Sequence, residues 1–101
     1  MSGLFQSRDK PYRTCFICGR SETEYNRLEV HHLFGAANRK KSDHYNLTVT
    51  LCHKCHNEPP FGVHHNAEMM DYLHRYGQRK AMQEQGWTAE QFAEIFGKNY
   101  L

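Results

Sequence analysis

Residues 47–56, with the sequence LTVTLCHKCH, join a strand pattern to a metal-ligand pattern. Apolar residues alternate with threonines over residues 47–51, which predicts a β-strand with one buried face. The next four residues, 52–55, have the spacing Cys-x2-Cys, which is typical of a zinc knuckle. A short helix is expected to begin within residues 52–58, and Pro59-Pro60 must stop it because proline does not continue a helix. The segment therefore predicts a strand that runs directly into a metal-binding helix.

A second Cys-x2-Cys pair, Cys15 and Cys18, lies upstream of Cys52 and Cys55. Zinc prefers four ligands in a tetrahedron, and two knuckles supply that number. The alternatives are two disulfides or four unrelated buried thiols. Disulfides are disfavoured because residues 1–14 are polar and charged and do not resemble a secretory signal. We therefore expect one structural Zn²⁺ ion bound by the four cysteines, and we expect it to contribute folding energy.

The chain between the two knuckles indicates a β-hairpin. Residues 28–33, LEVHHL, contain short apolar alternation and a β-branched valine, which favours a strand. Residues 34–46 are rich in glycine, asparagine and lysine, which favours a loop. Together with the strand over 47–51, they predict a hairpin with a long basic loop.

Two further helices are expected after the Pro-Pro pair. Asn66 is a suitable N-cap for a helix that continues to about Gln85, with Gly77 as a candidate interruption. Thr88 and Gln91 match the capping box of a last helix. The apolar face of that helix is formed by Phe92, Ile95 and Phe96.

The length of the chain limits the fold. At 101 residues there is room for one domain, which we expect to be α+β, with a core over about 13–66 and C-terminal helices over about 67–97. A core of this size gives only marginal stability, so a structural metal is expected to help. No stretch approaches the ~20 apolar residues that a membrane span needs, so we expect a soluble, intracellular protein.

Positive charge is concentrated in the half that carries most of the possible metal ligands. Residues 1–54 contain nine Lys or Arg against five acidic residues, whereas residues 55–101 contain four against six. The whole chain has a net charge of +2. A polyanion is therefore a plausible partner. A solvated, mildly basic face would explain the charge equally well.

Eight histidines are unusual in so short a chain, and three of them are placed to act together. His31 and His32 are adjacent on the first strand, so their side chains point to opposite faces. His56 lies about 100° around the helix from Cys55, so it can face the hairpin while Cys55 faces the zinc ion. This arrangement offers imidazole ligands for a second metal ion and leaves His32 free as a base. The alternative is that these are surface or core residues of an inactive scaffold.

Three other histidines are expected to be ordinary surface residues. They are His44, His53 and His74.

These motifs together resemble the HNH nuclease family, whose core is a small, treble-clef-like ββα-metal unit. The resemblance is carried by the upstream cysteine pair, by residues 29–33 (EVHHL) and by residues 47–56, and it covers about residues 13–66. The triplet Gly62-Val63-His64 and the chain end over residues 96–101 are also similar to the RecA-dependent phage nucleases that enhance recombination.

The resemblance implies a role for each histidine of the motif. His31 occupies the position of the first metal ligand, and His32 occupies the position of the general base. His56 occupies the ligand position on the helix. A third ligand is needed from elsewhere in the chain.

Two positions depart from the family pattern. Many members carry a further histidine one helical turn beyond the helix ligand, where this chain has Pro60. His64 or His65 must then reach in, and His64 is favoured because it belongs to the triplet shared with the phage nucleases. The family's middle asparagine position is Leu47 here, and Asn46 is one residue early. Asn46 can still pin the loop through its side chain if the turn carries a bulge.

The function implied by the resemblance is a metal-dependent DNA endonuclease that leaves a 5′-phosphate. A divalent cation held by His31, His56 and His64 can stabilise the phosphoryl and leaving oxygens. A histidine suits the role of base because its unperturbed pKa of about 6.5 is close to working pH. The catalytic ion is expected to be Mg²⁺, Mn²⁺, Ni²⁺ or Zn²⁺.

The implied partners are DNA and a recombinase filament, in the cytoplasm of a bacterial or phage-infected cell. Basic residues near the motif are expected to bind the flanking phosphates. These are Arg13, Arg20, Arg39, Lys40 and Lys41. The competing function is a non-catalytic zinc module that binds nucleic acid or a protein through its basic loop.

Overall fold

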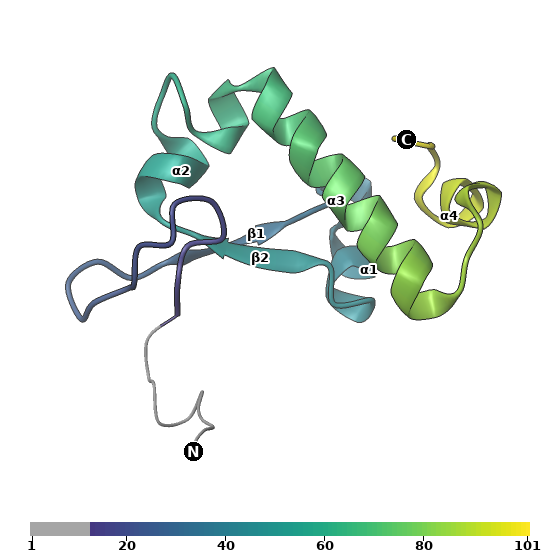
Figure 1. Cartoon of the computed structure of the whole chain (residues 1–101), viewed down its shortest axis with the longest axis horizontal. Helices are drawn as coiled ribbons and strands as arrows, with labels where there is room; N and C mark the ends of the chain where they lie inside the picture. Colours follow the sequence, from purple (N-terminus) through teal and green to yellow (C-terminus); the bar gives the residue numbers. More distant parts are fainter. Residues whose placement is uncertain (1–12) are drawn as a thin grey trace, which may run out of the picture.

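The structure is a computed structural model that describes residues 13–101 (Figure 1). The first twelve residues of the expected domain, and most of the polar N-terminal stretch, lie outside the described residues. Within the described part no helix is long and apolar enough to cross a membrane. The elements in chain order are β1 (Glu29–His32), η1 (Ala36–Asn38), α1 (Arg39–His44), β2 (Thr48–Leu51), α2 (His53–Asn57), η2 (Val63–His65), α3 (Ala67–Gln85) and α4 (Ala89–Phe96).

The hairpin is present as the sequence predicts, and its register decides which histidine is buried. β1 and β2 pair antiparallel, with His31 opposite Val49 and His32 opposite Thr48. Val49 and Leu51 are buried, and His31 lies on the same face with 4% of its surface exposed. His32, the last residue of β1, lies opposite Thr48 and is only partly buried. The fold is therefore a small α+β arrangement around a two-stranded sheet.

The prediction of a loop over residues 34–46 is wrong, because this segment contains η1 and α1. Residues 39–41 are arginine and lysines, which are good helix formers. The segment is also held by a buried side chain: the Ser42 hydroxyl accepts a hydrogen bond from the Phe34 N–H (3.1 Å) and donates one to the Phe34 carbonyl (2.6 Å). The glycine and asparagine residues of this segment favour a loop, so the sequence did not indicate a helix that depends on this tertiary contact.

The turn from α1 into β2 differs from the expected role of Asn46. Asn46 has φ +59°, a left-handed conformation that asparagine tolerates better than most residues. Within residues 13–101 its side chain makes no hydrogen bond, so it is the Ser42 hydroxyl that pins the loop. Leu47 is fully buried in the core.

Both C-terminal helices begin where the sequence predicts. The Asn66 side chain accepts a hydrogen bond from the Met69 N–H (3.0 Å) and caps α3. Thr88 and Gln91 form the capping box of α4. The buried apolar face of α4 packs on the buried ring of Phe34 through Phe92 and Phe96, with centroids 5.3 and 4.9 Å from it. α3 lies between α2 and α4 (Figure 1).

The expected interruption of α3 at Gly77 is wrong, because the helix is continuous through it. A Cβ atom at Gly77 would lie 2.8 Å from Cε2 of Phe34 and 3.2 Å from Cβ of Leu33. Glycine is therefore present because the chain after β1 approaches the helix closely, not because the helix breaks there.

Gly77→Ala is expected to destabilise the protein by roughly 1–3 kcal/mol, because the new methyl group must displace the buried Phe34 ring. In an open helix the same change would stabilise by about 1 kcal/mol, so the sign itself is informative. Urea unfolding measures the effect, with Gln83→Ala, an exposed position on α3, as the matched control. Unchanged or increased stability in Gly77→Ala would contradict the close approach.

Candidate metal centres

The four cysteines converge on one point, which we call the cysteine centre. Their sulfur atoms all lie within 4.8 Å of one another, and all four are free thiols rather than disulfides. Cys18 Sγ and Cys52 Sγ are 3.8 Å apart. Sulfurs about 2.3 Å from a tetrahedral zinc ion lie about 3.8 Å from each other. The four cysteines can therefore hold a metal ion such as zinc.

Backbone hydrogen bonds attach the first knuckle to the hairpin. Gly19, at φ +77°, closes the turn, and its N–H donates to the Cys15 carbonyl (2.9 Å). The Phe16 N–H donates to the Thr50 carbonyl (2.8 Å), and the Thr50 hydroxyl donates to the Thr14 carbonyl (2.9 Å). The second knuckle follows β2 at once. Both cysteine pairs are thus positioned by the same strand.

The thiols of this centre influence one another. Burial disfavours the thiolate of Cys15, but backbone N–H groups of Cys18, Cys52 and Ile17 outweigh it and lower the pKa of Cys15 to about 6. Burial, and then the neighbouring sulfurs, raise the pKa of Cys55. Several thiolates cannot be placed together without a compensating cation, which is what a bound metal ion supplies.

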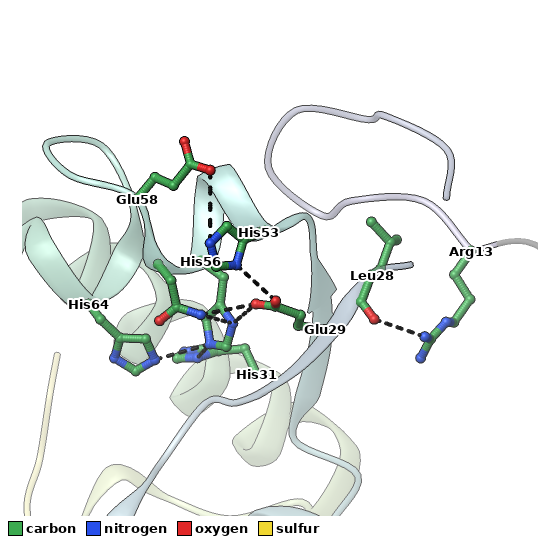
Figure 2. A network of polar contacts seen from close by, with 9 residues as sticks. Arg13, Leu28, Glu29, His31, His53, His56, Glu58 and His64 are labelled. Carbon is green, nitrogen blue, oxygen red and sulfur yellow. Dashed lines mark hydrogen bonds and ion pairs between the residues drawn. The ribbon is translucent and has the colours of Figure 1, made fainter. Parts of the chain in front are cut away.

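Three histidines form a second cluster, which we call the histidine trio. His31 comes from β1, His56 from α2 and His64 from η2, and their ligand atoms lie within 4.8 Å of one another. His56 Nε2 is 3.3 Å from His31 Nδ1 and 3.0 Å from His64 Nε2. Nitrogens about 2.1 Å from one ion, at tetrahedral or octahedral angles, lie about 3.0–3.4 Å apart. Figure 2 shows the three rings facing a common point.

The close packing of Gly62 explains why His64 reaches the trio. A Cβ atom on Gly62 would lie 2.6 Å from the backbone nitrogen of Glu58, so only glycine allows the chain to fold back onto the end of α2. The Gly62 N–H donates to the Glu58 carbonyl (2.7 Å). His64 then lies over His56, whereas His65, which is exposed like His64, does not belong to the cluster.

A carboxylate behind the trio orients His56. Nδ1 of His56 donates to Glu29 Oε1 (2.7 Å), which directs its Nε2 lone pair toward the other two rings (Figure 2). The Asn57 amide and His53 Nδ1 also donate to Glu29, at 3.0 Å each. The hydrogen bond from His56 is the main cause of the lowered pKa of Glu29. Such carboxylate partners fix the ring orientation of metal-bound histidines.

Two rings of the trio, His31 and His64, are in surroundings that disfavour protonation. Burial, and then the neighbouring His56 and His64, lower the pKa of His31 to about 4, so the ring is neutral at pH 7. Burial lowers the pKa of His64 as well. The His31 nitrogen that faces His56 is Nδ1, while the other ring nitrogen, Nε2, is buried and has no hydrogen-bond partner among residues 13–101. The donor set fits a divalent ion held by neutral imidazoles.

His32 lies beside the trio but is paired differently. Its Nε2 donates to Asp43 Oδ1 (2.8 Å), a residue of α1. The His32 side chain keeps 15% of its surface exposed, and Asp43 is largely exposed. The hydrogen bond leaves Nδ1 of the neutral ring as a free proton acceptor. His32 is thus oriented by a carboxylate on its Nε2 side.

The histidine trio and the His32–Asp43 pair meet at one cleft of about 540 Å³, which His32 and the three histidines of the trio line. Arg39, at the start of α1, lines it as well.

Of the five basic residues expected to bind phosphate, Arg39 is the one that lines the cleft. Lys40 is exposed on α1, and the Lys41 ammonium donates to the Ile95 carbonyl. Arg13 pairs with Glu22 (2.9 Å), and Arg20 lines a separate cavity. The structure therefore does not bring the knuckle arginines to the cleft.

The remaining histidines are not all ordinary surface residues. His44 is exposed, as expected. His53 is exposed too, but it pairs with Glu29, which raises its pKa. The expectation for His74 is wrong: its ring is partly buried, stacks on Phe34 and lines the cleft, because α3 turns this residue toward the chain after β1.

Sequence reasoning missed two carboxylates of the site. Glu29 stands two residues before His31, so strand alternation places both on one face, and this signal was available. Asp43 carried no comparable signal, because its approach to His32 depends on α1, a helix that composition concealed.

Glu29→Gln is expected to weaken binding of a divalent ion at the histidine trio about tenfold, because the amide loses the charge that supports His56. Calorimetric titration with Mn²⁺, with zinc retained at the cysteines, measures this. Glu58→Gln is the matched control, since the Glu58 side chain is exposed and, among residues 13–101, its carboxylate pairs with His53 alone, at 3.9 Å. Equal affinities in the two variants would show that Glu29 does not support the site.

The chain matches no protein-family model, and no curated protein or solved structure matches it. The assignment of a function therefore depends on the two clusters and on the cleft lined by residues of β1, α1, α2, η2 and α3.

Proposed function

We propose that this chain is a metal-dependent DNA endonuclease of the HNH type, with the cysteine centre as its structural zinc site. The supporting observation is the placement of an aspartate-paired histidine, His32, in the same cleft as the histidine trio. A binding module gains nothing from a base beside a metal site. The order of the elements, β1, β2 and α2, agrees with a ββα-metal core.

Hydrolysis of a phosphodiester needs an activated water molecule and stabilisation of charge on the phosphoryl and leaving oxygens. A divalent ion at the trio would supply the second requirement, as a Lewis acid. His31, His56 and His64 would hold it, and the hydrogen bond to Glu29 keeps His56 in the tautomer whose Nε2 is free to bind it.

His32 meets the first requirement. Its Nδ1 takes the proton from the attacking water while Nε2–H remains bound to Asp43. The Asp43 carboxylate stabilises the imidazolium that forms and holds the ring in place. Arg39 contributes positive charge for a phosphate of the DNA backbone.

Imidazole ligands suit zinc or nickel, while nucleases with one ion often accept magnesium or manganese, so the proposal includes all four ions. The similarity to RecA-dependent phage nucleases adds a recombinase filament as a partner, and the cytoplasm of a bacterial or phage-infected cell as the location.

Incubation with supercoiled plasmid and with single-stranded DNA, each with Mg²⁺, Mn²⁺, Ni²⁺ or Zn²⁺, tests the proposal. The wild type is expected to cut with at least one ion, and His56→Ala is expected to be inactive. His44→Ala, an exposed histidine of α1 outside the trio, is expected to cut like the wild type. A wild type that cuts neither DNA with any ion, with and without a recombinase filament, would overturn the proposal.

A further inference from the structure

One wall of the cleft is aromatic, and neither metal binding nor proton transfer explains it. His74 of α3 and Tyr100 near the chain end line the cleft with the trio. The His74 ring stacks on Phe34, with centroids 5.5 Å apart and planes inclined by 10°, and its centroid is 4.6 Å from that of Tyr100. Both His74 and Tyr100 are partly exposed. We call this pair the aromatic wall.

A fully buried glutamine fixes the position of the aromatic wall. Gln78 of α3 has none of its surface exposed. Its Oε1 accepts a hydrogen bond from the Tyr100 N–H (2.6 Å), and its Nε2 donates to Asn99 Oδ1 (2.8 Å). A buried amide is costly unless both ends are paired, so this side chain ties the last residues to α3. Tyr100 is thus a built part of the cleft.

Two positively charged side chains, Lys98 and Arg39, lie near the aromatic wall. The Lys98 ammonium lies 5.1 Å from the centroid of the Tyr100 ring, and Arg39 lines the same cleft. Burial, and then Lys98, lower the pKa of His74, which favours its uncharged ring. Aromatic faces with flanking cations bind single-stranded nucleic acid, with a base on the ring and the phosphates at the cations.

We infer that His74 and Tyr100 stack one unpaired nucleobase of the substrate, next to the phosphate that an ion at the histidine trio would hold. This rests on the proposed function and specifies its substrate class. In a duplex each base is covered by its neighbours, so the wall reaches a base only in a single strand or after the base leaves the stack. The substrate is therefore DNA with an unpaired base beside the scissile phosphate.

Binding to a fluorescent single-stranded oligonucleotide of about 20 nucleotides, without added divalent ion, tests the aromatic wall. Tyr100→Leu is expected to weaken binding about tenfold, whereas Tyr100→Phe keeps the ring and binds like the wild type. Tyr72→Leu is the matched control, because Tyr72 is an exposed tyrosine of α3 that does not line the cleft. Equal affinities of Tyr100→Leu and Tyr72→Leu would overturn the inference.

A second measurement uses only the wild type and so does not depend on the folding of a variant. One abasic site is moved along the same oligonucleotide, and at one position it is expected to weaken binding about tenfold. A change below about twofold at every position would also overturn the inference. If the protein cleaves DNA but no abasic position weakens binding, the inference about the aromatic wall is wrong and the proposed nuclease function stands. If binding depends on the position of the abasic site but no DNA is cleaved, the aromatic wall stands and the proposed nuclease function is wrong.

Discussion

His32→Ala is expected to reduce the rate of DNA cleavage by about a hundred- to ten-thousand-fold. Removing the imidazole leaves the attacking water without a proton acceptor. The histidine trio does not include His32, so the ion that polarises the phosphate should remain bound. Single-turnover cleavage with saturating ion measures the chemical step without product release.

Two comparisons separate loss of the base from loss of the site. His32→Ala should keep the wild-type affinity for Mn²⁺ and for single-stranded DNA, since it contributes to neither. Asp43→Asn should show a smaller loss of rate, because the amide still holds the ring at Nε2 but does not stabilise the imidazolium. Wild-type rates in His32→Ala would show that the water is activated elsewhere.

Removal of zinc is expected to unfold the domain. Structural zinc sites in small domains contribute about 10–16 kcal/mol of apparent binding energy, more than a chain of this size has from its core. Cys15 and Cys52 are themselves buried core residues, so their sulfurs cannot move into water without disrupting the hairpin. Chelation under reducing conditions, followed by far-ultraviolet circular dichroism, should show loss of helix.

Two variants separate the roles of the two centres: Cys15→Ser alters the cysteine centre, and His64→Ala alters the histidine trio. Cys15→Ser should yield little folded protein, and elemental analysis should find less than one zinc ion per chain. His64→Ala removes an exposed ligand of the trio, so it should keep the fold and one tightly held zinc ion. A chelated protein with an unchanged helix signal would show that the cysteine centre does not stabilise the fold.

Local patterns in the sequence predicted most of the elements that build the candidate site. Alternation defined both strands, and side-chain caps at Asn66 and Thr88 placed the starts of α3 and α4 within one residue. The Cys-x2-Cys spacing located the four sulfurs that the fold brings together. Each of these signals acts within a few residues, so it can be recognised without knowledge of the fold.

The errors arose where contacts distant in sequence decide the structure. α1 depends on the Ser42 hydroxyl bound to Phe34, and the continuity of α3 at Gly77 depends on the ring of that same phenylalanine. His74 becomes a cleft residue for the same reason. Composition cannot reveal such contacts, because nothing near Gly77 or His74 in the sequence identifies residue 34 as a neighbour.

The five-residue helix α2 supplies ligands to both centres, since Cys55 belongs to the cysteine centre and the adjacent His56 to the histidine trio. Occupation of the two centres would therefore be linked. Loss of an ion from the cysteines would displace His56 together with Cys55, whereas loss of an ion from the histidine trio would leave the four sulfurs in place. Metal limitation would then inactivate the protein by unfolding it, and adding back only the ion of the histidine trio would not restore activity.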